Sequence, residues 1–204
     1  MTTAVGFYGK IPSRGDFVRA GLPSSFVEPW DAWLQTVLPA ARATLGDDWD
    51  AVWLKAPVWR FLLPAGHCGP AAVLGLWMPS VDAAGRQFPL TFAAMLRSDT
   101  HPKIEAAKLW LDQMETAGRE AIAFDFSPQD LTANVSRHSA ILRPLECDGA
   151  GRGRLGRQGA THQLGRWWID GGQALNVCST ELRLLPEIER FRAMLRAEAL
   201  FKAQ

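Results

Sequence analysis

The sequence predicts an α+β fold (an α/β sandwich) in which helices flank a mostly antiparallel central sheet. Apolar runs of strand length alternate with stretches of helical periodicity, in the order β-α-α-β-β-β-α-α-β-β-α, and no internal repeats are present. A chain of 204 residues buries roughly 70% of its unfolded surface, so one core can form without metal or disulfide staples. We therefore expect residues 1–204 to form a single domain.

The amino-terminal part begins with a short strand over residues 4–8 that runs into a glycine-bearing loop. Ser25 and Glu28 predict a capping box for a tryptophan-rich amphipathic helix. Pro39 should kink or end this helix, because a proline lacks the amide hydrogen of a helix interior. Gly46 is expected to be its last possible stop.

The next segment predicts an antiparallel meander. A short helix over residues 48–55 precedes a strand at 58–63. Two further apolar runs, 71–78 and 88–96, are rich in β-formers, and the connection between them, 79–87, has turn chemistry.

The carboxy-terminal half predicts helices around one hairpin. A long helix should start at Thr100, with Pro102 in its first turn, and lie across the sheet through the stripe Ile104, Ala107, Leu111, Met114 and Ala121. A short helix is expected to start at residues 127–130.

A hairpin is predicted from residues 167–169 and 174–178 around the turn 170–173. Pro186 should open a last helix that turns Ile188, Phe191 and Leu195 inward. The glycine- and arginine-rich segment at about 148–165 lacks large apolar residues, so we expect a mobile loop there.

Charge and cysteine usage restrict the class of protein. The formal net charge of +1 provides no long-range field for nucleic acid or an anionic membrane. No run approaches the roughly 20 apolar residues of a membrane-spanning helix, so membrane insertion is not expected. Cys68, Cys147 and Cys178 are widely spaced and follow no signal-peptide pattern, which favours a reducing cytoplasm.

The familiar catalytic and cofactor motifs are incomplete in this sequence. Gly9-Lys10 lacks the rest of a phosphate-binding loop, and residues 151–156 match a dinucleotide fingerprint without its strand and helix context. No hydrolase motif is present, and the spacing of His67, Cys68, Cys147, His162 and Cys178 is not that of a zinc site. We therefore expect no catalytic residues, metal or cofactor.

Two basic or aromatic features have an ordinary structural interpretation. Arg152, Arg154, Arg157 and Arg166 could contact phosphates, but a solvated loop is the more common outcome, so no nucleic-acid partner is predicted. Helical spacing of Trp30 and Trp33 favours the core over a base- or sugar-stacking platform.

Two polar connections carry the candidate site. One is the loop after the first strand, with Lys10, Ser13, Arg14 and Asp16, and the other is the turn with Ser80, Asp82 and Arg86. Arg14, Asp16, Arg60, Asp82 and Arg86 could form either a structural salt-bridge network or a binding site. A third interpretation adds His67 and makes the charged group an acyl- or phosphoryl-transfer enzyme.

Four ordered blocks resemble the TagF family, accessory proteins encoded with bacterial type VI secretion systems. They are residues 6–17, residues 26–33 with Pro29-Trp30-Asp31-Ala32-Trp33, Ala56-Pro57-Val58-Trp59-Arg60-Phe61, and Pro79-Ser80-Val81-Asp82 through Phe88-Pro89-Leu90-Thr91. Trp167-Trp168 and Glu189-Arg190-Phe191 also match the expected end, although the resemblance over residues 125–204 is looser.

The resemblance implies a longin- or profilin-like adaptor fold and a cytoplasmic, non-enzymatic, post-translational repressor of type VI secretion. It implies a forkhead-associated scaffold protein as partner, with a functional link to the threonine kinase and phosphatase pair that sets its phosphorylation. Partner contacts are expected at Lys10, Ser13, Arg14, Asp16, Arg60, Ser80, Asp82 and Arg86. The alternative is a small hydrolase or phosphoryl-transfer enzyme that uses Arg14, Asp16 and Asp82.

Overall fold

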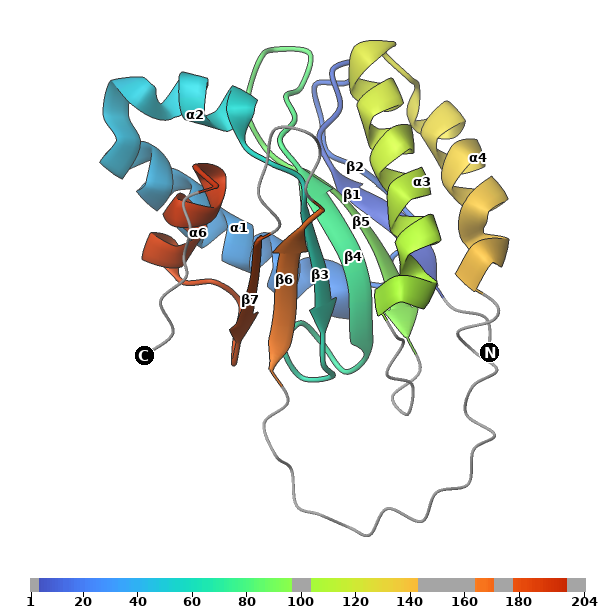
Figure 1. Cartoon of the computed structure of the whole chain (residues 1–204). Coiled ribbons are helices and arrows are strands. Elements are labelled where there is room, and N and C mark those ends of the chain that lie inside the picture. The colour runs from blue at the N-terminus through green and yellow to red at the C-terminus, as the bar shows by residue number, and fades with distance from the viewer. Residues whose placement is uncertain (1–3, 97–103, 143–163, 171–177, 198–204) are drawn as a thin grey trace, which may run out of the picture.

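The computed structural model describes residues 4–96, 104–142, 164–170 and 178–197 (Figure 1). Its centre is a seven-stranded sheet in the order β2-β1-β5-β4-β3-β6-β7, and each neighbouring pair is antiparallel. The strands are β1 (Val5–Gly9), β2 (Val18–Ala20), β3 (Trp59–Leu63), β4 (Ala72–Met78), β5 (Leu90–Leu96), β6 (Gly165–Ile169) and β7 (Cys178–Leu182). The predicted α+β fold is confirmed.

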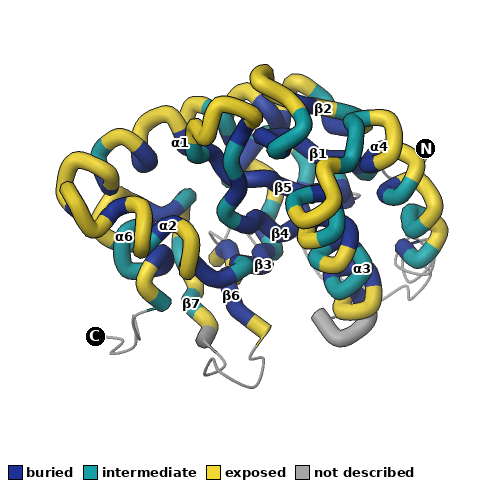
Figure 2. Tube along the Cα trace, turned by 90° about the horizontal axis from the view of Figure 1, so that it is seen from above, coloured by how far each residue is buried: buried dark blue, intermediate teal, exposed yellow. Residues whose placement is uncertain are grey.

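Helices cover both faces of the sheet (Figures 1 and 2). One face carries α1 (Ser24–Leu45), α2 (Trp49–Lys55) and α6 (Ile188–Leu195), and the other carries α3 (Ile104–Ala123) and α4 (Pro128–His138). Short 3₁₀ turns follow α1 at Gly46–Asp48 and α4 at Ser139–Leu142. Each face has its own apolar core, because successive strand residues point to opposite sides.

Trp30 and Trp33 belong to the core, as their helical spacing predicted, although Trp33 is only half-buried. Trp30, Trp53, Trp59 and Trp167 are buried between the sheet and the helices of the α1 face. The Trp30 indole also donates a hydrogen bond to Thr91 Oγ1 at 3.0 Å, which ties α1 to β5. These rings pack against other side chains and form no stacking platform for a ligand.

The first helix differs from its prediction at two points. The expected capping box is wrong, because α1 begins at Ser24 after Pro23 and has no side-chain cap. Pro39 does not end the helix, which continues to Leu45. Because Pro39 is exposed, water can bond to the backbone carbonyl that would otherwise accept from its missing amide hydrogen. The stop at Gly46 is confirmed, since this residue has φ +53 and donates its amide hydrogen to Arg42 O.

The meander is confirmed, since β3, β4 and β5 pair in succession. In α3 the predicted stripe is buried at Ala107, Leu111, Met114 and Ala121, while Thr100 and Pro102 lie outside the described residues. Ser127 caps α4 through a capping box with Asp130.

The last third differs from its prediction in part. The hairpin consists of β6 and β7: Ile169 pairs with Cys178, and β7 continues to Leu182, beyond the predicted end at 178. Residues 171–177, which hold most of the predicted turn and second strand, lie outside the described residues. Ile188 is exposed, whereas Phe191 and Leu195 point inward as expected. Gly165 belongs to β6 and Leu164 directly precedes that strand, whereas residues 148–163 of the predicted mobile loop lie outside the described residues.

Candidate functional site

The loop after β1 and the turn after β4 meet at one end of the strands, near the C-terminal end of α3 (Figure 1). We call this meeting of residues 10–17 and 80–87 the loop–turn junction. Gly9 lets β1 enter it, with φ +145; a Cβ there would lie 2.0 Å from the Pro89 carbonyl oxygen. Only glycine fits at this close approach of two backbones.

A buried ion pair joins the two segments. Lys10 Nζ lies 2.6 Å from Asp82 Oδ2, and both side chains are almost completely excluded from water. Arg86 Nε donates to the same oxygen at 2.7 Å, while Asp82 Oδ1 accepts from the amides of Ala84 and Arg86 at 2.9 Å each. Asp82 thus has four donors, which fills the acceptor capacity of a carboxylate.

The same contacts decide the protonation state of Asp82. Burial is the largest single influence and favours the neutral acid, but the hydrogen bonds from Lys10 and Arg86 together outweigh it. The pKa of the Asp82 carboxyl is therefore held well below its usual range. This carboxylate stays charged and has no proton to donate.

Backbone contacts complete the junction. The Ala83 amide donates to Arg14 O at 2.9 Å, and Arg86 Nη2 donates to Gly15 O at 2.6 Å. Ser80 Oγ donates to Lys10 O at 2.8 Å. The loop and the turn are therefore one body rather than two independent connections.

A further contact extends the junction to the second helical layer. Ser13 Oγ donates to the carbonyl oxygen of Phe126, at 2.6 Å, in the link between α3 and α4. Each of the predicted site residues Lys10, Ser13, Ser80, Asp82 and Arg86 thus has a structural contact here.

The outer side of the junction presents Arg14, Asp16 and Phe17 to solvent. Phe17 is 44% exposed, yet its ring stacks on Tyr8 and meets Phe88 edge-on. Among the described residues, neither the Arg14 nor the Asp16 side chain forms an ion pair. The predicted network therefore contains Asp82 and Arg86 but not these two residues.

Arg60 also lies outside that network. It is the second residue of β3, and its guanidinium reaches Asp112 at 2.8 Å and Glu115 at 2.9 Å in α3, and Asp170 at 3.0 Å just after β6. Lys108 pairs with Asp112 and Asp170. We call these five residues the Arg60 cluster.

Contacts within the Arg60 cluster shift the pKa values of three of its groups. Burial opposes the charge of Arg60, but the hydrogen bonds to Glu115 and Asp112 outweigh it and raise its pKa. The hydrogen bond between Lys108 and Asp170 raises the pKa of the amine and lowers that of the acid. These shifts keep Arg60, Lys108 and Asp170 charged at neutral pH.

The proposed enzymatic grouping of Arg14, Asp16, Arg60, Asp82 and His67 is not assembled. His67 lies between β3 and β4, and Asp82 follows the other end of β4, a strand that spans roughly 20 Å. No metal-binding group of histidine, cysteine or acidic residues occurs within the described ranges. No helix among the described residues is both long enough and apolar enough to cross a bilayer.

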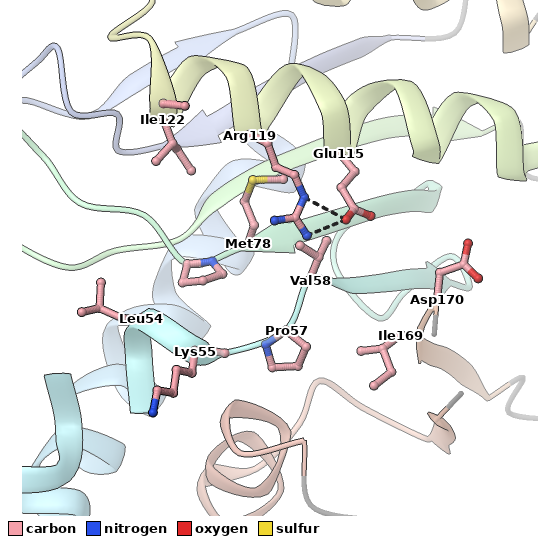
Figure 3. A pocket seen from close by; sticks show the side chains of 13 residues that line it. Leu54, Lys55, Pro57, Val58, Met78, Glu115, Arg119, Ile122, Ile169 and Asp170 are labelled. Carbon is pink, nitrogen blue, oxygen red and sulfur yellow. Dashed lines mark hydrogen bonds and ion pairs between the residues drawn. The ribbon is translucent and has the colours of Figure 1, made fainter. Parts of the chain in front are cut away.

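A groove of about 620 Å³ lies beside the Arg60 cluster (Figure 3). Its floor is formed where the chain enters β3 and leaves β4 and β6, at Pro57-Val58, Met78-Pro79 and Ile169-Asp170. Residues 54–56 at the end of α2 form one wall, and Glu115, Arg119, Ile122 and Ala123 of α3 form the other.

Sequence reasoning did not single out the groove or the partners of Arg60. The Lys108–Asp112 and Glu115–Arg119 pairs have the four-residue spacing that puts opposite charges side by side on a helix. That spacing marks a charged helix face, but only the position of β3 next to β4, the strand on which α3 packs, shows that Arg60 meets it.

Comparison with known proteins finds a matching family and a similar solved structure. A family model described as TagF N-terminal domain, type VI secretion system-associated, matches residues 6–138. The crystal structure of PA0076 from Pseudomonas aeruginosa PAO1 superposes with a TM-score of 0.75 at 28% identity, covering 98% of this chain and 97% of that one. No curated protein sequence matches. Because the family model spans well over half of the sequence, this chain belongs to the TagF family, whose members are associated with type VI secretion.

Proposed function

We propose that this chain is a non-enzymatic accessory protein that represses type VI secretion after translation by binding another protein. The loop–turn junction is the observation that carries this proposal. The charged side chains in its core, Lys10 and Asp82, pair with each other, and Arg86 bonds to the same carboxylate. The junction presents the exposed Arg14, Asp16 and Phe17 on a backbone that these contacts hold in place. A preorganised aromatic side chain with polar neighbours is typical of protein-binding surfaces, because little freedom is lost on association.

The chemistry of Asp82 argues against the enzymatic alternative. A general base needs a free lone pair, and a general acid needs a proton near neutral pH. Asp82 has four donors and a lowered pKa, so it is suited to neither role.

The proposed partner is a forkhead-associated scaffold protein of the same secretion system. Membership of the TagF family supports the link to type VI secretion. The scaffold, its kinase and phosphatase pair, and a cytoplasmic location are parts of the proposal that follow from the family resemblance. Contact is proposed through Phe17 and its neighbours rather than through the buried Lys10 and Asp82.

The test is a titration of the purified chain with the purified scaffold, in its phosphorylated and unphosphorylated forms, by isothermal calorimetry. We expect Phe17→Ala to weaken binding tenfold or more, as for an aromatic anchor, and Arg14→Ala to weaken it by less. Arg137→Ala, an exposed arginine on α4, is the matched control and should bind like wild type.

Secretion provides the second readout. Deletion of the gene should raise export of type VI effectors, and the Phe17→Ala chain should fail to restore repression. Absence of binding to either scaffold form, or turnover of phosphate or ester substrates that Asp16→Asn abolishes, would contradict the proposal.

A further inference from the structure

We infer that the groove between α2 and α3 binds a short protein segment that carries apolar side chains and a carboxylate. This inference rests on the proposed function, because it adds a second contact surface for a protein partner. The groove lies at the same end of the strands as the loop–turn junction, between the helical layers (Figures 1 and 3).

The groove has the size and surface of a binding site. Its volume of about 620 Å³ falls within the roughly 300–1,000 Å³ of typical ligand pockets. Val58 and Ile122 are half-buried and present apolar side chains above the buried Met78 and Ile169, and Leu54 stands at the rim, 72% exposed. Covering Val58, Ile122 and Leu54 would be favourable because apolar surface leaves water.

The charges of the groove favour an anionic occupant. Its two acids, Glu115 and Asp170, are already paired with Arg60. Arg119 stands on the α3 wall and shares Glu115 with Arg60. Lys55 belongs to the α2 wall; its amine points away from Arg119 (Figure 3), and its flexible four-carbon stem allows it to turn toward an incoming anion. Lys55 forms no ion pair with any residue that the structure describes.

Counting both groups of charges gives a positive excess. The groove and the Arg60 cluster together hold the cations Lys55, Arg60, Lys108 and Arg119 against the anions Asp112, Glu115 and Asp170. A carboxylate placed between the walls would meet Arg119 and, once its side chain turns inward, Lys55, whereas a basic segment would meet only acids that are already paired with Arg60. Electrostatic complementarity of this kind selects between partners more than it adds affinity.

The floor favours a polypeptide over a nucleic acid. Phosphate backbones are bound by several cations in a row, and the binding weakens steeply with salt. Here one cation on each wall flanks a floor that contains two prolines and the side chains of valine, methionine and isoleucine. Such a surface matches alternating apolar and acidic residues of a peptide.

The experiment uses the full chain and a phage-displayed library of random twelve-residue peptides. We expect the selected peptides to combine leucine, isoleucine, phenylalanine or methionine with aspartate or glutamate. A fluorescein-labelled peptide of the selected consensus should then bind about tenfold more weakly to Lys55→Gln and to Arg119→Gln by fluorescence anisotropy. Arg137→Gln on α4 is the control and should bind like wild type.

The Arg119→Gln chain should fold normally, because Glu115 keeps its ion pair with Arg60 when Arg119 is replaced. Thermal melts of each variant check this point. A charge exchange adds a second test: Lys55→Glu should prefer the consensus peptide in which lysine replaces the acid.

Selection of no peptides, selection of basic peptides, or binding that is indifferent to Lys55 and Arg119 would overturn the inference. A dimer by sedimentation that Leu54→Arg dissociates would also overturn it, since a second copy would then occupy the groove. Scaffold binding that is lost in Phe17→Ala but normal in both groove variants would refute the inference and leave the proposed function intact.

Discussion

The loop–turn junction and the Arg60 cluster contain the same kinds of charged residue, but they differ in how water reaches them. In the junction the Asp82 side chain is completely buried, and its partner Lys10 is nearly so. In the cluster Arg60 is buried, whereas Asp112 and Asp170 each remain 39% exposed. In the junction the buried pair excludes water and the acceptor positions of Asp82 are filled, which we call a closed arrangement. In the cluster the exposed acids can bond to water or to other cations, which we call an open arrangement.

This difference separates structure from binding. A closed pair makes each member indispensable to the other, because a lone charge in the interior is strongly unfavourable. An open cluster shares its charges among several partners, so the loss of one is partly compensated. Stability should therefore depend mainly on the junction, and ligand contact should depend on the exposed residues around both regions.

The largest effect is expected from Asp82→Ala. This change leaves Lys10 buried without its partner and removes the acceptor of two turn amides. We expect a loss of about 3–5 kcal/mol in the free energy of unfolding and a melting temperature lower by about 10 °C. Urea unfolding followed by circular dichroism measures it.

The control for that prediction is the double variant Lys10→Met/Asp82→Ala. Removing the lysine charge should restore part of the lost stability, giving a coupling energy of at least about 1 kcal/mol. Additive losses would mean that the two charges do not depend on each other, which would contradict the closed arrangement.

Arg60→Met should come next, with a loss of about 2 kcal/mol. The variant leaves three carboxylates without their shared guanidinium, but Lys108 still pairs with Asp112 and Asp170, and both acids reach water. The same urea titration checks it. A loss larger than that of Asp82→Ala would reverse the proposed ranking of the two regions.

The sequence predicted these two regions unequally. It identified Lys10, Asp82 and Arg86, because turn residues next to apolar runs mark ordered connections. It could not pair Lys10 with Asp82, which is 72 positions away, since Arg14, Asp16 and Arg60 offered equally plausible charges. The choice depends on the pairing of β1 with β5, a long-range contact that no local pattern specifies.

The same limit applies to the fold. Apolar runs predicted β3, β4 and β5, and periodicity predicted the buried face of α3, because these signals are local. The three-residue strand β2 was missed, since Val18–Ala20 is too short to show alternation and is a strand only because it pairs with β1. Pro39 was overinterpreted, because sequence alone does not tell that its face of α1 is exposed.

The free energy of unfolding at low pH should report on the ionisation of Asp82 in the junction. The folded-state pKa of Asp82 is depressed, so its contribution to stability is present above the unfolded-state pKa, near 3.9, and is lost as pH falls through the folded value. Wild type should therefore begin to lose stability near pH 5 and continue to lose it as the pH falls well below 3. Asp82→Asn should lose less over that interval, although Asp170, whose pKa is also lowered, contributes in both proteins. Parallel curves of urea midpoint against pH would contradict this assignment.

The smallest effects come from two arginines that form a matched pair. Arg86 and Arg119 have side chains that are 62% and 66% exposed, and each pairs with an acid four positions earlier. Their partners differ: Asp82 is completely buried, whereas Glu115 is partly exposed and keeps Arg60. We expect Arg86→Gln to cost about 1 kcal/mol and Arg119→Gln less than about 0.5 kcal/mol by urea unfolding.

Equal costs for these two variants would mean that the burial of the acid partner does not matter, and the distinction between a closed and an open cluster would fail. If Arg119→Gln is nearly silent in stability but weakens peptide binding about tenfold, the same side chain separates the two roles. An exposed cation such as Arg119, whose acid partner already pairs with Arg60, contributes little to folding. For that reason it remains available to an incoming carboxylate.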